Sequence, residues 1–99
     1  MKEANVLGKQ YVVDIFLFLN EREETTTSHL KEISSYYQGV VQRAKELEKL
    51  GFVKIVEQRR PFHKKTFSLT SQGKEVAKVI LEAEKMVKEM EADSYHGWV

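Results

Sequence analysis

Residues 35–70 restrict the possible folds of this 99-residue chain more than any other stretch. A helical pattern with one polar face runs from Ser35 to Gly51, and two short segments with strand-like alternation follow it directly. The loop between those two segments is rich in lysine and arginine. A polar helix face beside a short basic hairpin is well suited to contact DNA, because bases and phosphates need different side chains. We expect the other segments to support this pair.

The helix expected from Ser35 to Gly51 has an apolar face made of residues at helical spacing: Val40, Ala44 and Leu47. Gly51 is a natural helix stop. Ser35 and Gln38 match a capping box, S-x-x-Q, in which each side chain satisfies a free backbone N–H at the helix start. The opposite face is polar: Gln38, Gly39, Gln42, Arg43, Glu46 and Lys49.

The two segments after this helix, residues 52–58 and 65–70, alternate in polarity and are predicted to be the strands of a hairpin. Pro61 suits the turn between them. The net charge of the whole chain is only +1, so an argument for a polyanionic partner depends on where the charges lie. Residues 54–65 contain one acidic residue, Glu57, and five basic ones: Lys54, Arg59, Arg60, Lys64 and Lys65.

The first helix is expected at residues 9–20, with one apolar face made of Val12, Ile15, Phe16 and Leu19. It is apolar on its other sides as well, because of Tyr11, Leu17 and Phe18. Thr25 to Thr27 favour an extended segment, since β-branched side chains suit a strand. Thr27 or Ser28 is then expected to cap a short helix that buries Leu30 and Ile33 and ends at Ser34 and Ser35.

The last helix is predicted to begin at the cap Thr70 and to fray after Asp93, which leaves residues 94–99 as a tail without a pattern. Its apolar residues run past the end of a small core, so we expect residues 71–93 to form a homodimer together with the surplus face of the first helix. The expected interface residues are Tyr11, Phe18, Val79, Ile80, Ala83, Met86, Val87 and Met90.

Several function classes are not expected. The chain has no cysteine, and His29, His63 and His96 lie in separate elements without metal-ligand spacing, so we expect no metal and no cofactor. No catalytic motif is present, so we expect no enzymatic activity. Residues 1–9 contain no apolar core of signal-peptide length, and no run is long enough to span a membrane, so we expect a cytoplasmic protein with no membrane partner. The length of 99 residues predicts one domain, residues 1–99.

Two stretches resemble MarR-type and related dimeric winged-helix regulators: residues 45–53, which read KELEKLGFV, and residues 67–73, which read FSLTSQG. The resemblance implies an α+β, mostly helical fold of helix, short strand, helix, helix, two-stranded wing and long C-terminal helix. It further implies that the third helix lies in the major groove of DNA, that the wing contacts the backbone or minor groove, and that terminal helices form a dimer. The chain is shorter than full-length MarR proteins.

The candidate DNA contacts on the third helix are Ser35, Tyr37, Gln38, Gly39, Gln42 and Arg43. Those on the wing are Arg59, Arg60, His63, Lys64 and Lys65. Glutamine can pair with adenine and arginine with guanine. The alternative for each set is a solvated surface, and for the tyrosine a place in the core. Gly39 fits either a close approach to DNA or a close crossing by the preceding helix.

The sequence therefore predicts a homodimeric, sequence-specific transcriptional regulator that binds double-stranded DNA; any small-molecule effector is unknown. The main alternative is a winged helix that binds a partner subunit through its last helix. A third hypothesis, an architectural DNA protein without sequence preference, fits the glutamine-containing face less well. Binding to random duplex DNA that weakens steeply with salt distinguishes the first hypothesis from the second.

Overall fold

The computed structural model describes residues 6–97, with side chains up to residue 92. Two 3-10 helices, η1 and η2, accompany three α-helices and three strands. In chain order the elements are η1 (Val6–Gly8), α1 (Val12–Glu21), β1 (Thr25–Thr26), η2 (Thr27–Glu32), α2 (Tyr37–Lys49), β2 (Val53–Gln58), β3 (Lys64–Leu69) and α3 (Ser71–Gly97). The predicted mostly helical α+β architecture is confirmed, and α2 is the helix expected after Ser35.

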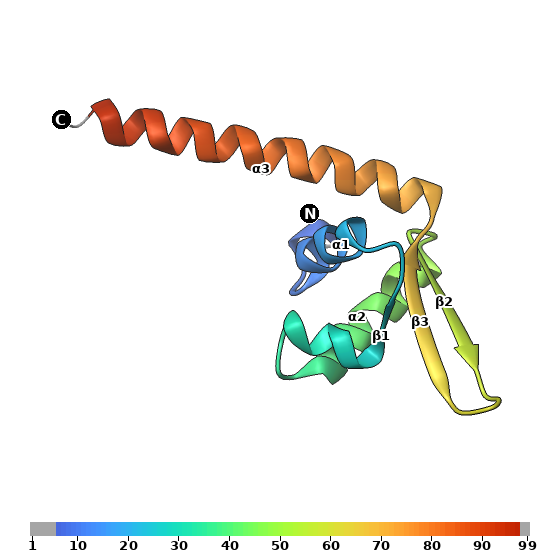
Figure 1. The fold of residues 1–99 in the computed structure, drawn as a ribbon. Coiled ribbons are helices and arrows are strands. Elements are labelled where there is room, and N and C mark those ends of the chain that lie inside the picture. Colours follow the sequence, from blue (N-terminus) through green and yellow to red (C-terminus); the bar gives the residue numbers. More distant parts are fainter. Residues whose placement is uncertain (1–5, 98–99) are drawn as a thin grey trace.

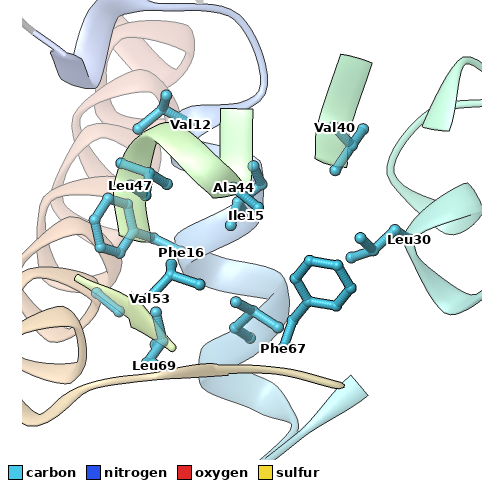
Figure 2. Close-up of a cluster of buried hydrophobic side chains, with 12 residues drawn as sticks. Val12, Ile15, Phe16, Leu30, Val40, Ala44, Leu47, Val53, Phe67 and Leu69 are labelled. Atoms are coloured by element: carbon cyan, nitrogen blue, oxygen red, sulfur yellow. The ribbon is translucent and has the colours of Figure 1, made fainter. Parts of the chain in front are cut away.

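One apolar cluster holds these elements together (Figure 2). Every residue predicted for the buried face of α1 and every one predicted for the buried face of α2 is buried. Phe67 of β3 is fully buried, and the rings of Phe16 and Phe52 meet edge to face with centroids 5.8 Å apart. The remaining buried apolar residues are Leu69 of β3 and one residue from each of three further elements: Leu30 of η2, Val53 of β2 and Ala77 of α3.

The sheet has the order β1-β3-β2, and all its pairs are antiparallel. The expected extended segment at Thr25 is confirmed as a two-residue strand, in which Thr25 pairs with Phe67. The hairpin of β2 and β3 is also confirmed and extends to the pair of Gln58 with Lys64. It projects from the body of the molecule on the side away from α3 (Figure 1). We call the hairpin, residues 53–69, the wing.

The predicted capping box of α2 is not formed. The helix begins at Tyr37 with Tyr36 as its N-cap residue and no side-chain cap, so Gln38 is one position too early to reach back. The hydroxyl of Ser34 instead accepts a hydrogen bond from the backbone N–H of Tyr36 at 3.1 Å. Ser35 is exposed.

The predicted cap at Thr27 or Ser28 is also wrong. The short helix η2 starts at Thr27 itself and has no side-chain cap. The hydroxyl of Thr26, the residue before it, lies 3.2 Å from both the Ser28 hydroxyl and Nδ1 of His29. These side chains hydrogen-bond to one another, and so none of them caps the backbone.

The cap at Thr70 is confirmed, since its hydroxyl accepts a hydrogen bond from the N–H of Gly73 at 3.0 Å. The fraying expected after Asp93 is wrong, because α3 continues to Gly97. No proline or glycine interrupts residues 74–96, and each added residue gains a backbone hydrogen bond without a new nucleation cost. Trp98 and Val99 of the expected tail lie outside the described residues.

The core covers only the first part of α3. Ala77 is fully buried, and Val76 and Ile80 are half-buried against the cluster, whereas residues 81–92 are all exposed. The helix therefore extends beyond the rest of the domain and gives the molecule its dimensions of 60 × 31 × 26 Å (Figure 1). No helix within residues 6–97 is both long and apolar enough to cross a membrane.

The two stretches that carry the family resemblance meet in space at the ends of α2 and β3. Gly51 has φ 92° and ends α2 with a pair of hydrogen bonds: its own N–H donates to Glu48, and the N–H of Phe52 donates to Leu47, both at 3.0 Å. The hydroxyl of Thr70 donates to the carbonyl of Gly51 at 2.7 Å. This junction joins the end of α2, the wing and the start of α3, and thereby sets their relative positions.

Candidate nucleic-acid interface

The exposed face of α2 is polar and positively charged. The helix packs its apolar residues on the core, and the residues spaced four, three and four apart on the opposite side are exposed: Gln38, Gln42, Lys45 and Lys49. Two of these, Gln38 and Gln42, were predicted as DNA contacts. Lys45 was not, although its spacing of three from Gln42 indicates the same face. We call these four residues the reading face.

Arg43 lies beside the reading face and is directed at the protein. Its Nε donates a hydrogen bond to the carbonyl of Gln10 at 3.1 Å, and one terminal nitrogen lies 2.6 Å from a carboxylate oxygen of Glu46. The other oxygen of Glu46 accepts a hydrogen bond from Lys9 at 2.7 Å. These three side chains link α2 to the chain just before α1. Sequence spacing alone had placed Arg43 among the exposed polar residues.

Gly39 permits two tyrosine rings to lie against the start of α2. A Cβ atom added to this residue would stand 2.9 Å from the ring of Tyr36 and 3.1 Å from the ring of Tyr11. The sequence left two explanations for Gly39 open, close approach to DNA and close crossing by the preceding helix. The structure gives a packing reason, but the close neighbours are two tyrosine rings and not a crossing helix. Tyr37 is half-buried, with the Lys31 ammonium 5.2 Å from its ring centroid.

The basic residues of the wing gather at its tip, residues 59–63, and on the adjoining strand ends. Arg59, Arg60 and Lys64 are exposed, and Lys65 is half-buried. His63 has a partner already, because its Nε2 lies 2.7 Å from a carboxylate oxygen of Glu57. The hydrogen bond from His63, more than nearby cations, holds the pKa of Glu57 below its ordinary value. The sequence patterns gave no reason to single out Phe62, which also lies at the tip.

Comparison with known proteins identifies the fold. No family model and no curated protein matches the sequence. Among solved structures, a transcriptional regulator homologue from Pyrococcus horikoshii OT3 superposes with a TM-score of 0.73 at 23% identity, covering 88% of each chain. The candidate transcriptional regulator ytfH from Salmonella typhimurium gives 0.74 at 17% identity, with 93% of this chain and 83% of that one covered. Diamide-treated YodB from B. subtilis gives 0.67 at 19% identity, covering 85% and 84%.

The chain has the winged helix-turn-helix fold. In this winged helix, η2 and α2 form the helix-turn-helix, and the β2–β3 hairpin is the wing. The wing tip lies on the side of the molecule away from α3, whose distal part carries the acidic residues of 82–93 (Figure 1). The basic and acidic parts of the domain are therefore separated in space. No group of three or more potential metal ligands occurs within the described part of the winged helix.

Tyr11 and Phe18, which were predicted to lie in the dimer interface, are partly buried by contacts within the winged-helix domain itself. The guanidinium of Arg22 stands 3.9 Å from the centroid of the Phe18 ring, and Tyr11 packs beside Gly39 while its hydroxyl accepts a hydrogen bond from Ser34 at 3.4 Å. On α3, in contrast, the predicted residues are open: Val79, Ala83, Met86, Val87 and Met90 are exposed, and only Ile80 is half-buried.

The ion pairs of Glu46 predict how stability depends on pH. Hydrogen bonds from Lys9 first and Arg43 second hold the pKa of Glu46 below its ordinary value of 4.5. A lowered pKa in the folded state contributes stability that is complete above the ordinary value and is lost as the pH falls through the lowered one. We therefore expect the unfolding free energy of the parent to fall more steeply below pH 4.5 than that of Glu46→Gln.

Urea titrations at a series of pH values measure this pH dependence of the unfolding free energy, with Glu48→Gln as the control on the same helix. Parallel curves for the parent and Glu46→Gln would contradict it.

Proposed function

We propose that the protein is a sequence-specific transcriptional regulator that binds double-stranded DNA as a homodimer, with α2 in the major groove and the wing on the phosphate backbone. The observation that carries this proposal is the reading face, which stands exposed on the second helix of a helix-turn-helix next to a braced basic wing. Structures with the same fold include transcriptional regulators, which supports the proposal.

Gln38 and Gln42 are the proposed base-reading residues, because glutamine can form two hydrogen bonds with the major-groove edge of adenine. Lys45 and Lys49 continue the same face and carry charge toward the phosphates. Ser35 and Tyr37 at the start of α2 stay proposed DNA contacts, and so does Gly39, where the absence of a side chain leaves room for the rings of Tyr36 and Tyr11.

We assign Arg43 a different role from the one that its sequence suggested. A base contact by Arg43 requires its guanidinium to leave Gln10 and Glu46, whereas Gln42 is exposed and faces outward. Arg43 is therefore proposed to hold α2 at the correct angle to α1. Arg43→Ala is accordingly expected to lower thermal stability as well as DNA affinity, and Gln42→Ala to lower affinity alone.

The proposed dimer uses the open stripe of α3. Val79, Met86, Val87 and Met90 recur at spacings of seven, one and three and are each more than half exposed. The stripe continues toward the domain into a groove that Gln72 and Glu75 line together with six apolar residues: Leu7, Leu50, Phe52, Val76, Val79 and Ile80. A helix of 27 residues is about 40 Å long, which is enough for two copies to bury an interface of ordinary size. Two-fold symmetry then predicts a pseudo-palindromic site with half-sites about 10 base pairs, or about 34 Å, apart.

One observation favours the alternative, a partner subunit docked on α3. Acidic residues seven positions apart border the stripe on both sides: Glu82 and Glu89 on one, Glu84 and Glu91 on the other. Such a border suits a basic partner protein. Selection of bound sequences from a random duplex library decides between the two, because a recovered inverted repeat requires a symmetric DNA-binding dimer.

The reading face and the wing are expected to fail differently when mutated. Gln42→Ala should cost about 1 to 3 kcal/mol on the preferred site and relax the preference at particular positions, with little change on random DNA. Arg59→Ala with Arg60→Ala should weaken binding to all sequences. The slope of the logarithm of the binding constant against the logarithm of salt concentration, the salt slope, should become shallower by about 1 for each phosphate that each subunit no longer neutralises. Titrations of specific and random duplexes at several salt concentrations measure both effects.

The control for the wing variant is Lys74→Ala with Lys78→Ala. It removes the same charge from exposed positions on α3, away from the reading face and the wing. If the wing variant binds random DNA as tightly as the parent, Arg59 and Arg60 form only a solvated turn. If Gln42→Ala keeps full affinity and preference, the reading face is placed incorrectly.

A further inference from the structure

Phe62 is the least covered large apolar side chain in the described part of the chain, with 66% of its surface exposed. It stands at the tip of the wing, remote from the core cluster. A ring with this exposure contributes little to folding by burial, since most of its apolar surface stays in water. Aromatic residues are enriched in the parts of a protein surface that a partner covers.

The loop around Phe62 is braced on both sides. The side-chain amide of Gln58 donates a hydrogen bond to the carbonyl of Arg60 at 2.6 Å, and His63 contacts Glu57 at 2.7 Å. Both braces tie tip residues to β2. The ring is therefore held by a preorganised loop, which reduces the entropy lost when it binds a partner.

The charges around Phe62 restrict what can cover it. Arg59, Arg60 and Lys64 are exposed within three residues of Phe62 in the chain, so an apolar protein surface would have to desolvate these cations without compensation. The suitable partner presents an apolar surface within a frame of negative charge. Duplex DNA has this combination, because its stacked bases lie between two rows of phosphates.

The proposed function determines which part of the DNA Phe62 meets. With α2 in the major groove as proposed, the hairpin beside it is expected at the neighbouring minor groove, a position that the resemblance to winged-helix regulators also implies. That groove is about 6 Å wide, too narrow for two strands about 4.8 Å apart with their side chains, so only a residue of the tip can enter.

We infer that Phe62 is an apolar wedge that enters the minor groove and partly unstacks one base step, while the flanking cations contact the phosphates on either side. The inference depends on the proposed placement of α2. The wedge would make the wing contribute to sequence preference as well as to affinity, because unstacking is easiest at flexible pyrimidine–purine steps. The preferred site should therefore contain such a step at a fixed distance outside each half-site.

The test compares Phe62→Ala and Phe62→Leu with the parent on the selected site. The loss of base stacking on aromatic side chains predicts that alanine weakens binding by roughly 5- to 150-fold. Leucine, itself an effective wedge, should weaken it less. The salt slope should stay unchanged in both variants, because phenylalanine displaces no counterion. Val56→Ala is the matched control, since this valine is 47% exposed on the same wing. It should bind like the parent.

A fluorescent base analogue, 2-aminopurine, placed at the flanking step reports unstacking directly. Its emission should rise when the parent binds and should not rise with Phe62→Ala. If Phe62→Ala binds as tightly as the parent and gives the same emission, the wedge is refuted while the proposed function stands. If the parent itself shows no salt-dependent binding to duplex DNA, the proposed function fails, and the wedge fails with it.

Discussion

Replacing Gly73 with alanine is expected to destabilise the domain by about 3 kcal/mol or more, through steric overlap at the junction between α2, the wing and α3. A Cβ atom at this position would lie 2.1 Å from the carbonyl oxygen of Phe52 and 3.1 Å from a methyl carbon of Leu69. That carbonyl is backbone and also accepts the N–H of Thr70 at 3.0 Å. Relief therefore requires the first turn of α3 to move, which disrupts the hydrogen bonds of Thr70.

The direction of this effect is informative, because glycine to alanine in a helix interior ordinarily stabilises by up to about 1 kcal/mol. Gly8→Ala is the control, since nothing lies within 4 Å of the added carbon at that position. Urea unfolding followed by circular dichroism measures both variants. An equal or raised unfolding free energy for Gly73→Ala would show that the junction tolerates a side chain and that its tight packing does not position α3.

Val87→Glu is expected to dissociate the proposed dimer and, with it, to abolish tight binding to a two-half-site operator. Val87 is 53% exposed in the free chain and lies on the stripe of α3 beyond the core. A carboxylate buried there would lack a partner, and an uncompensated buried charge in an interface costs several kcal/mol. We expect the dissociation constant of the dimer to rise by about 100-fold or more.

Leu81→Glu is the matched control for the dimer. Leu81 is 50% exposed on the same helix, but it is two residues from Val79 and therefore on the opposite side. Light scattering over a range of concentrations should give the monomer mass for Val87→Glu and the dimer mass for Leu81→Glu and the parent. A monomeric parent at micromolar concentration contradicts the dimer, and equal dissociation in both variants contradicts its placement on the stripe.

Local sequence patterns were sufficient to predict most of the elements. The spacing of Val12, Ile15, Phe16 and Leu19 identified the buried face of α1, and that of Val40, Ala44 and Leu47 the buried face of α2. Alternating residues predicted both strands of the wing, and Thr70 was recognised as a cap. These features depend on contacts between residues close in the chain and on which face of each element is buried. Both appear in the sequence as a periodic pattern of apolar and polar residues.

Helix ends were predicted less well for a physical reason. Ser35 and Gln38 match the capping-box sequence, but α2 starts one residue later than this box requires, so the two side chains cannot cap it. Similarly, the end of α3 at Gly97 depends on continued backbone hydrogen bonding, which the residues after Asp93 neither favour nor forbid strongly. Small energy differences decide such ends, and several registers fit one sequence.

The directions of individual polar side chains were decided only by the tertiary structure. Arg43 turns to the carbonyl of Gln10, which is 33 residues earlier in the chain, and shares Glu46 with Lys9. No spacing within α2 contains that information. In the same way, the carbonyls of Gly51 and Phe52 meet Thr70 only once the wing has folded back on itself. The sequence thus determined the elements and their buried faces, whereas contacts between distant segments decided which polar side chains of α2 stay exposed.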